Sequence, residues 1–446
     1  MKESQAAARP RTLLKYRSLV SPSDGRKLFL MCWAIYCITY LGRLNYSAAL
    51  ADIVTSNVMP RDKAGMISTA FFFMYGLGQL INGYLGDRTS PFRMIGRGVL
   101  MAGISNCLMF AVTRIAVTPE LFIVIWGLNG FSQSSIWSPA IRIVSSMLPE
   151  EQRVQACIRM MMTTAAGTLL SYLLSTLLLS VANWQTVFIV PGALLILAGI
   201  AWFILTSPLV RKLEYRVETE PEQKPEKKNA EGQLLPLLLV SGVVFMFVMV
   251  CMMAMVRDGV STWTPTFIAD IFGTSAALSV LLTTLLPLVN LLASPFTRLV
   301  NEKWLHNELK STAFFFLIVV TAVVLLYLFG TLHIALMIAL MAIISCATIC
   351  INTLLLSLVP MHFSYYGRVA TITGLLNCVA ALGNSMSSLI VGFVTEPWSV
   401  LAMIGIWCIM GTVGMIFGLL VSGRWQRFIT DTAARKAAKE ETPAQN

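Results

Sequence analysis

The chain has 446 residues, of which 56% are hydrophobic and 12% are charged, and its mean hydropathy is +0.73. A composition this apolar has too little polar surface to cover a soluble globule, so it predicts a protein with many membrane-spanning segments. The formal net charge of +11 does not indicate a nucleic-acid-binding protein, because the basic residues lie in the gaps between apolar segments rather than on one face.

Apolar segments recur twelve times along the chain. Each has roughly 20 to 30 residues, enough to cross about 30 Å of hydrocarbon at about 1.5 Å per residue. The basic N-terminal tail runs directly into the first segment, so we expect an uncleaved signal anchor. The expected membrane-spanning helices lie at about 28-54, 64-85, 94-113, 119-147, 154-181, 184-206, 234-270, 274-299, 311-330, 332-359, 366-394 and 397-422.

A single long charged, proline-containing stretch, with YRVETEPEQKPEKKNAEGQ at its centre, interrupts this pattern. It predicts a flexible linker between two halves of six helices each. The expected fold is therefore an all-α membrane protein in which an axis along the membrane normal relates the halves. The expected parts are a tail at 1-27, a six-helix bundle at 28-206, a linker at 207-233, a second bundle at 234-422 and a tail at 423-446.

The distribution of basic residues predicts the orientation in the membrane. Of the 33 Lys and Arg residues, 26 lie on the side of the two tails, three lie on the other side and four lie within apolar segments. This excess predicts that both termini are cytoplasmic. The nine cysteines fall inside apolar segments without CxxC pairs or nearby histidines, so we interpret them as small core residues. We expect neither a metal nor a cofactor.

Two arginines, Arg43 in the first apolar segment and Arg257 in the seventh, lie at equivalent places in the two halves. An arginine at the centre of a membrane helix costs about 2.5 to 3.5 kcal/mol. The only acidic residue at depth is Asp258, which lies about 100° round the helix from Arg257. At most one arginine can therefore be neutralised. The sequence therefore predicts a cavity with net positive charge, which would bind an anionic ligand.

Polar side chains accompany Arg43 on the same face of its helix. The positions Tyr36, Tyr40, Arg43 and Ser47 follow one another at spacings of four, three and four residues. Further candidates for binding the substrate lie in other apolar segments, although each can equally bond across helices as structural support. They are Tyr75, Gln79, Asn82, Gln133, Trp137, Thr164, Asn290, Asn352 and Asn377.

The stretch Gly83–Arg93, GYLGDRTSPFR, follows the second apolar segment. It resembles the loop signature between the second and third helices of the major facilitator superfamily. Asp87 can lie against the positive N-terminal end of another helix, while Arg88 and Arg93 can bind carboxylates or lipid phosphates. Such contacts form in one conformer and break in the other. We expect a conformational gate here, with the helix that begins near Tyr366 as its partner.

Further motifs are similar to the organophosphate:phosphate antiporters, a branch of that superfamily. The residues that carry the resemblance are Arg43, Leu44 and Asn45; Gly130, Gln133, Trp137, Pro139 and Arg142; Arg257, Gly259, Trp263, Pro265 and Thr266; and Gly367, Gly374 and Gly383. The resemblance implies an alternating-access exchanger in which Arg43 and Arg257 bind the phosphoryl group. The family includes carriers of glycerol-3-phosphate and hexose phosphates. Gln79 and Thr164 stand where some members have lysine and histidine, so the particular substrate does not carry over.

The expected function is exchange of a small phosphorylated or otherwise anionic metabolite for inorganic phosphate, by a transporter of the bacterial inner membrane acting as a monomer. The sequence contains no GxxxxGK[ST] loop, no metal-ligand cluster and no nucleophile with an adjacent base, so we expect that the protein is not an enzyme. Two alternatives stay open. One is a proton-coupled transporter of organic anions such as carboxylates, with Asp258 as the titrating group. The other is a sugar-phosphate sensor with little transport.

Overall fold

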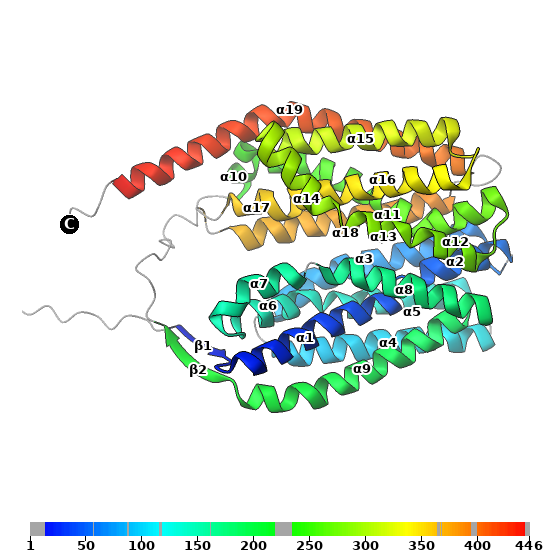
Figure 1. Ribbon diagram of the computed structural model, residues 1–446, viewed down its shortest axis with the longest axis horizontal. Helices are drawn as coiled ribbons and strands as arrows, with labels where there is room; N and C mark the ends of the chain where they lie inside the picture. The colour runs from blue at the N-terminus through cyan, green and yellow to red at the C-terminus, as the bar shows by residue number, and fades with distance from the viewer. Residues whose placement is uncertain are drawn as a thin grey trace, which may run out of the picture.

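The computed structural model describes residues 14–56, 58–86, 89–115, 118–160, 162–218, 234–363, 366, 368–393 and 399–441. Two bundles of helices lie side by side (Figure 1). The N-terminal half holds α1 (Pro22–Thr39), η1 (Tyr40–Gly42), α2 (Asn45–Thr55), α3 (Arg61–Gly86), α4 (Pro91–Ile115), α5 (Pro119–Ser134), α6 (Trp137–Ser146), α7 (Glu150–Met160), α8 (Met162–Val181) and α9 (Thr186–Arg211).

The C-terminal half begins after residue 233. Its helices are α10 (Leu234–Ser241), α11 (Val243–Phe272), α12 (Ala276–Thr283), α13 (Leu285–Asn290), α14 (Ala293–Arg298), η3 (Leu299–Leu305), α15 (Glu308–Phe329), α16 (Ile334–Asn352), η4 (Thr353–Leu358), α17 (Val359–Met361), α18 (Val369–Phe393) and α19 (Ser399–Glu441). The start of α1 and the end of α19 lie at the same end of the molecule, which we call the terminal end (Figure 1). We call the opposite end the far end.

Eleven stretches of the described residues are long and apolar enough to span a membrane. The expected segment at 119-147 is not among them, because it is divided into α5, with 16 residues, and α6, with 10 residues. Pro139 accounts for the break, since it lacks an N–H and its ring clashes with the carbonyl four residues earlier. With α5 and α6 taken as one broken helix, the structure fits the predicted twelve-helix fold in two halves.

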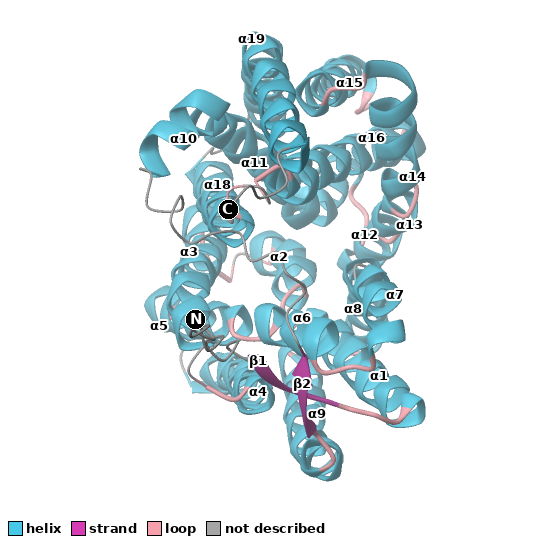
Figure 2. Ribbon diagram, turned by 90° about the vertical axis from the view of Figure 1, so that its left-hand side faces the viewer, coloured by secondary structure: helices cyan, strands magenta, loops and turns pink. Residues whose placement is uncertain are grey.

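A small sheet accompanies the helices and was not predicted from the sequence. Strand β1 (Leu14–Ser18) pairs antiparallel with β2 (Glu214–Glu218), so part of the N-terminal tail is joined to part of the expected linker. Figure 2, which views the molecule from the terminal end, shows both strands beside the N-terminal half. Nearby, Lys212 Nζ lies 2.9 Å from Asp24 Oδ2. The rest of the linker, residues 219–233, lies outside the described residues, as do residues 1–13 and 442–446 of the tails.

Small residues let the helices of each half approach closely. A Cβ atom on Gly130 of α5 would lie 2.2 Å from the carbonyl oxygen of Phe71 on α3. A Cβ atom on Gly383 of α18 would lie 2.8 Å from the carbonyl oxygen of Cys251 on α11. Such close backbone packing is typical of helix association in lipid, where no hydrophobic effect drives helices together. Between the halves, α3 packs on α18, α2 on α11, and α8 on α12 and α13.

Candidate functional site

The first membrane segment is interrupted where Arg43 stands. The helix α1 ends at Thr39, one turn of 3-10 helix follows, and α2 begins only at Asn45. Arg43 and Leu44 therefore lie in a break near the middle of the segment. A break of this kind exposes backbone groups that need hydrogen-bond partners inside the protein, because lipid supplies none.

One of these backbone groups is the carbonyl oxygen of Gly42, which is hydrogen-bonded by side chains from two other helices. It accepts hydrogen bonds from Asn129 Nδ2 at 2.8 Å, Gln133 Nε2 at 3.0 Å and Asn106 Nδ2 at 3.2 Å. The side chain of Gln133 is only 1% exposed. Its amide nitrogen therefore supports the break around Arg43, while its Oε1 is buried without a hydrogen-bond partner among the described residues. The two asparagines were not singled out from the sequence.

We expect this network to set the position of Arg43. The double substitution Asn129→Ala and Gln133→Ala removes two of the three donors, and an unsatisfied buried polar group costs about 1–3 kcal/mol. The variant should unfold at a lower temperature and bind the substrate more weakly. Ser180→Ala is the matched control, because the Ser180 hydroxyl is bonded only within its own helix, to the carbonyl of Leu177. Unchanged binding and stability in the double variant would show that the network is dispensable.

Aromatic rings surround the guanidinium of Arg43. Its Cζ lies 4.6 Å from the ring centre of Tyr75, 5.2 Å from that of Tyr40 and 5.9 Å from that of Phe71. Contacts of this kind between a cation and a ring are worth about 0.5–2 kcal/mol each. The Nε atom of Arg43 is buried without a hydrogen-bond partner among the described residues. The rings thus hold the cation in place but leave part of its donor capacity free.

Most of the other predicted binding residues of the N-terminal half gather beside this arginine. The ring centres of Tyr36 and Tyr40 are 5.7 Å apart, and those of Tyr36 and Trp137 are 4.6 Å apart. The hydroxyl of Tyr40 donates to Thr164 Oγ1 at 3.3 Å. Thr164 itself is exposed. The structure therefore brings α1, α6 and α8 together around a polar and aromatic surface.

Three further predicted residues differ in their surroundings. Gln79, one turn from Tyr75 on α3, is half-buried and makes no contact with a polar partner in the part of the chain that the structure describes. Asn377 on α18 donates to a backbone carbonyl of its own helix. The Ser47 hydroxyl donates to the carbonyl of Thr262 at 2.6 Å, so it joins the two halves instead of standing free for a ligand.

Arg257 supplies the second guanidinium, from the middle of α11. Its Nη1 donates to Asn352 Oδ1 of α16 at 2.6 Å. This guanidinium interacts electrostatically with Asp258 on its own helix and, from across the interface between the halves, with Tyr40, Tyr75 and Arg43. The two arginines therefore approach each other from opposite halves.

Asp258 does not form an ion pair with either arginine. Its carboxylate accepts hydrogen bonds from Ser388 Oγ at 2.9 Å and from Thr262 Oγ1 at 3.3 Å, and the residue is 5% exposed. Within the described residues neither Arg43 nor Arg257 has a carboxylate oxygen within ion-pair distance. Two guanidiniums thus remain without an ion-paired carboxylate in a low-dielectric region, where charge is costly unless a counter-charge is bound.

Hydrogen bonds join the halves on the far-end side of this site. Thr69 Oγ1 donates to the carbonyl of Ser385 at 3.2 Å, and Ser385 Oγ donates back to the carbonyl of Thr69 at 3.1 Å. The hydroxyl of Tyr172 donates to the carbonyl of Ser261 at 2.9 Å. These bonds connect α3 with α18 and α8 with α11. They hold the two halves together at the far end.

An ion pair between Arg61 of α3 and Asp270 of α11 adds to this closure. The side chains are 10% and 21% exposed, and the Cζ of Arg61 also lies 5.9 Å from the ring centre of Trp263. This pairing was not predicted from the sequence. A partly buried pair of this kind is lost only at a cost, because separating the partners leaves desolvated charges behind.

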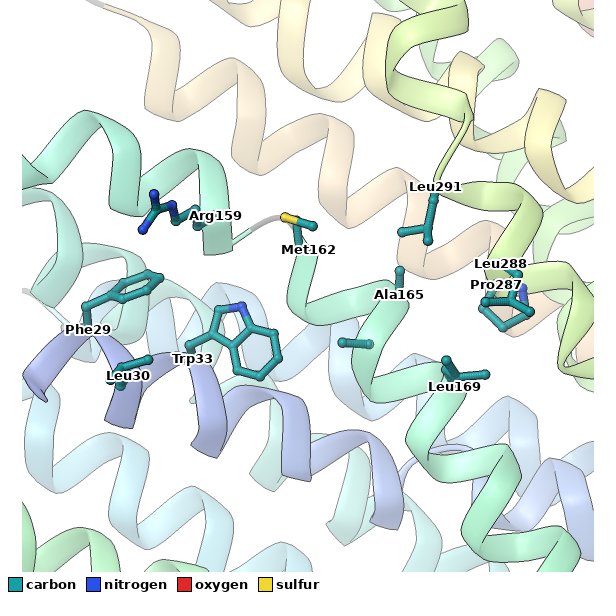
Figure 3. A pocket seen from close by; sticks show the side chains of 11 residues that line it. Phe29, Leu30, Trp33, Arg159, Met162, Ala165, Leu169, Pro287, Leu288 and Leu291 are labelled. Carbon is teal, nitrogen blue, oxygen red and sulfur yellow. The ribbon is translucent and has the colours of Figure 1, made fainter. Parts of the chain in front are cut away.

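Nearer the terminal end, a mainly apolar cavity of about 520 Å³ is lined by side chains of both halves (Figure 3). Side chains of α1 and α8 line one wall, and side chains of α13 line the other. They include Phe29, Trp33, Ala165, Leu169, Pro287 and Leu288. The cavity lies beside the contact between α8 and α13, so the two halves meet there as well as at the far end.

The predicted gate lies partly outside the described residues, which omit Asp87 and Arg88. Arg93, in the first turn of α4, is exposed and faces a groove that α3 and α5 also line. The expected partner helix, α18, begins at Val369, three residues after Tyr366. Tyr366 stacks on Phe428 of α19, with ring centres 5.8 Å apart.

Known proteins with similar sequences are membrane proteins. A probable hexose phosphate transport protein of Chlamydia muridarum is 23% identical over 183 residues, which are 41% of this chain and 39% of that protein. The membrane sensor protein UhpC of Escherichia coli is 31% identical over 108 residues, which are 24% of each chain. The chain thus matches less than half the length of these relatives. They agree with the resemblance to the organophosphate:phosphate antiporters.

A crystal structure of a bacterial homologue of the human lysosomal transporter Spinster has the same fold. It superposes with a TM-score of 0.69 at 16% identity and covers 92% of this chain and 99% of its own. The sequence profile of the Major Facilitator Superfamily matches residues 32–388. The chain, with its two helical halves around a shared site, therefore belongs to the major facilitator superfamily of membrane transporters.

Proposed function

We propose that this transporter exchanges a small phosphorylated, or otherwise anionic, metabolite for inorganic phosphate. The observation that carries the proposal is the pair of guanidiniums, Arg43 and Arg257, that come from opposite halves without an ion-paired carboxylate among the described residues. A guanidinium stays charged at any working pH and can give two parallel hydrogen bonds to phosphate. One phosphoryl group bound between the two arginines would offset both positive charges and could accept hydrogen bonds from both guanidiniums.

The mechanism follows from this position between the halves. An empty site keeps two positive charges near each other, which opposes closure of the halves around it. A bound phosphoryl group offsets that repulsion and lets the halves approach at the terminal end. The bonds at the far end, such as those between Thr69 and Ser385, then break and open the site to the other side.

The setting we propose is the bacterial inner membrane, with both termini cytoplasmic. The excess of Lys and Arg on the side of the tails supports this orientation, and the similarity to bacterial hexose phosphate transport proteins supports the membrane and the substrate class. Because the site lies between two halves of a single chain, one copy contains all the groups that the exchange needs, and we propose a functional monomer.

Exchange of phosphate between the two sides of a vesicle tests the proposal. Purified protein in proteoliposomes preloaded with phosphate should take up labelled phosphate rapidly, and vesicles without internal phosphate should not. Hexose phosphates and glycerol phosphate should compete for uptake, whereas the free sugars should not. Absence of exchange under these conditions would contradict the proposal, and binding of a hexose phosphate without exchange would favour a sensor.

A proton-coupled transporter of organic anions is the second candidate, and the burial of Asp258 beside Arg257 is the observation that favours it. Phosphate exchange does not require this carboxylate to titrate. We therefore expect Asp258→Asn to retain most of the wild-type exchange, because the amide keeps the shape and can still bond to Ser388 and Thr262. A variant that loses uptake driven by a pH gradient would instead identify Asp258 as the proton-coupling group. Ser388→Ala, which keeps the carboxylate, is the control.

A further inference from the structure

A second groove lies wholly within the N-terminal half, away from the interface between the halves. Its volume is about 540 Å³, and α3, α4 and α5 enclose it. Figure 2 shows these three helices as neighbours on one side of that half. The groove is lined by Arg93, Arg97 and Met101 of α4, by Leu128 and Phe131 of α5, and by Ser90 just before α4, among others.

One end of this groove carries concentrated positive charge. Arg93 and Arg97 are four residues apart on α4, so their side chains lie on the same face of the helix, where like charges repel. Both are exposed. Neither makes an ion pair, a hydrogen bond or a ring contact with another group in the described ranges, whereas several other arginines of the chain do. An anion between them would relieve the repulsion.

The other end of the groove is apolar and open to the side. Met101 is 48% exposed and Leu128 is 44% exposed, and both lie in helices of the membrane bundle. Residues Pro91–Ile115 form a candidate membrane span, so Arg93 and Arg97 lie in its first two turns and Met101 lies about one turn deeper. The groove therefore runs from a basic region near the membrane surface to an apolar wall at the depth of acyl chains.

We propose that this groove binds an anionic phospholipid of the bilayer. The phosphate of the headgroup lies between Arg93 and Arg97, and an acyl chain follows Met101, Leu128 and Phe131. Basic pockets between membrane helices recognise anionic headgroups in this way. A free phosphate ion would use the two arginines but not the apolar wall, and neither Arg43 nor Arg257 lines the groove.

Lipid selectivity of the purified protein tests this site independently of transport. The thermal unfolding midpoint is measured in detergent with phosphatidylglycerol or with phosphatidylcholine of the same acyl chains, and retained lipid is detected by native mass spectrometry. We expect wild-type protein to retain phosphatidylglycerol and to unfold at a higher temperature with it than with phosphatidylcholine. Arg93→Gln with Arg97→Gln should abolish that preference.

The control variant, Arg211→Gln with Arg427→Gln, removes the same charge from two exposed arginines outside the groove and should keep the preference. Arg93→Lys with Arg97→Lys should keep most of it, because ammonium groups still attract phosphate, and this variant separates loss of binding from loss of folding. If the variant with Arg93→Gln and Arg97→Gln prefers phosphatidylglycerol as strongly as the control variant does, the proposed site is wrong. Displacement of the lipid effect by millimolar inorganic phosphate would show a free-anion site instead.

Discussion

Replacement of Arg257 by alanine is expected to abolish phosphate exchange while the protein stays folded and inserted. The only described hydrogen-bond partner of this guanidinium is the neutral Asn352, and the nearby carboxylate of Asp258 keeps its hydrogen bonds to Ser388 and Thr262 when the guanidinium is removed. Removal of a charge from the middle of a membrane helix also lowers the insertion cost by about 2.5 to 3.5 kcal/mol. The same result is expected for Arg43→Ala, because that guanidinium contacts mainly aromatic rings.

The expected loss of affinity is large. Hydrogen bonds to charged groups contribute about 1.5–3 kcal/mol each, so the loss of a bidentate pair corresponds to roughly 10² to 10⁴-fold weaker binding. The measurement is uptake of labelled phosphate into phosphate-loaded proteoliposomes at matched protein density. Arg114→Ala is the control, because Arg114 is exposed and its described contact is with the ring of Phe110. Folding is checked by gel-filtration profile and thermal unfolding.

Substitution of either arginine by lysine distinguishes recognition of the substrate by charge alone from recognition by the planar shape of the guanidinium. An ammonium keeps the charge but loses the planar fork, so Arg257→Lys and Arg43→Lys should also fail largely. Substantial exchange in a lysine variant would count against bidentate binding of a phosphoryl group. It would leave an anion site that recognises charge alone, and the substrate class would then be wider than phosphates.

The order of the membrane helices could be predicted from the sequence because length and hydropathy largely decide whether a segment spans lipid. The breaks within the helices could not be predicted in the same way. Pro139 does mark the interruption between α5 and α6, but nothing of that kind marks the break around Arg43, which depends on donors from other helices at the carbonyl of Gly42. The pairing of β1 with β2 joins residues 14–18 to residues 214–218, too far apart for any local pattern.

The two arginines of the site stood out in the sequence because a charge at depth in an apolar segment is costly. Their neighbours were harder to predict, because helical periodicity tells which face a residue shares but not what packs against that face. Ser47 illustrates this limit, since its hydroxyl bonds to Thr262 of the other half. Gln133 illustrates it again, since its amide bonds to Gly42 inside its own half.

A covalent link across the far end is expected to stop exchange completely. Thr69 of α3 and Ser385 of α18 exchange hydrogen bonds between hydroxyl and carbonyl at 3.1 and 3.2 Å, so their backbones are neighbours across the two halves. If the site opens to alternate sides by movement of one half against the other, this contact must break in every cycle. Thr69→Cys with Ser385→Cys should therefore be active when reduced, inactive after oxidation and active again after a reductant is added.

The matched control links two helices of the same half. Ser311 of α15 donates to Asn301 of η3 at 2.9 Å, so Asn301→Cys with Ser311→Cys should form its link without stopping exchange. The single-cysteine variants share the nine native cysteines, all of them buried or half-buried, and report any background effect of oxidation. Full cross-linking at the far end with undiminished exchange would mean that α3 and α18 stay in contact throughout the cycle. The ion pair between Arg61 and Asp270 would then be a fixed support rather than a contact that opens.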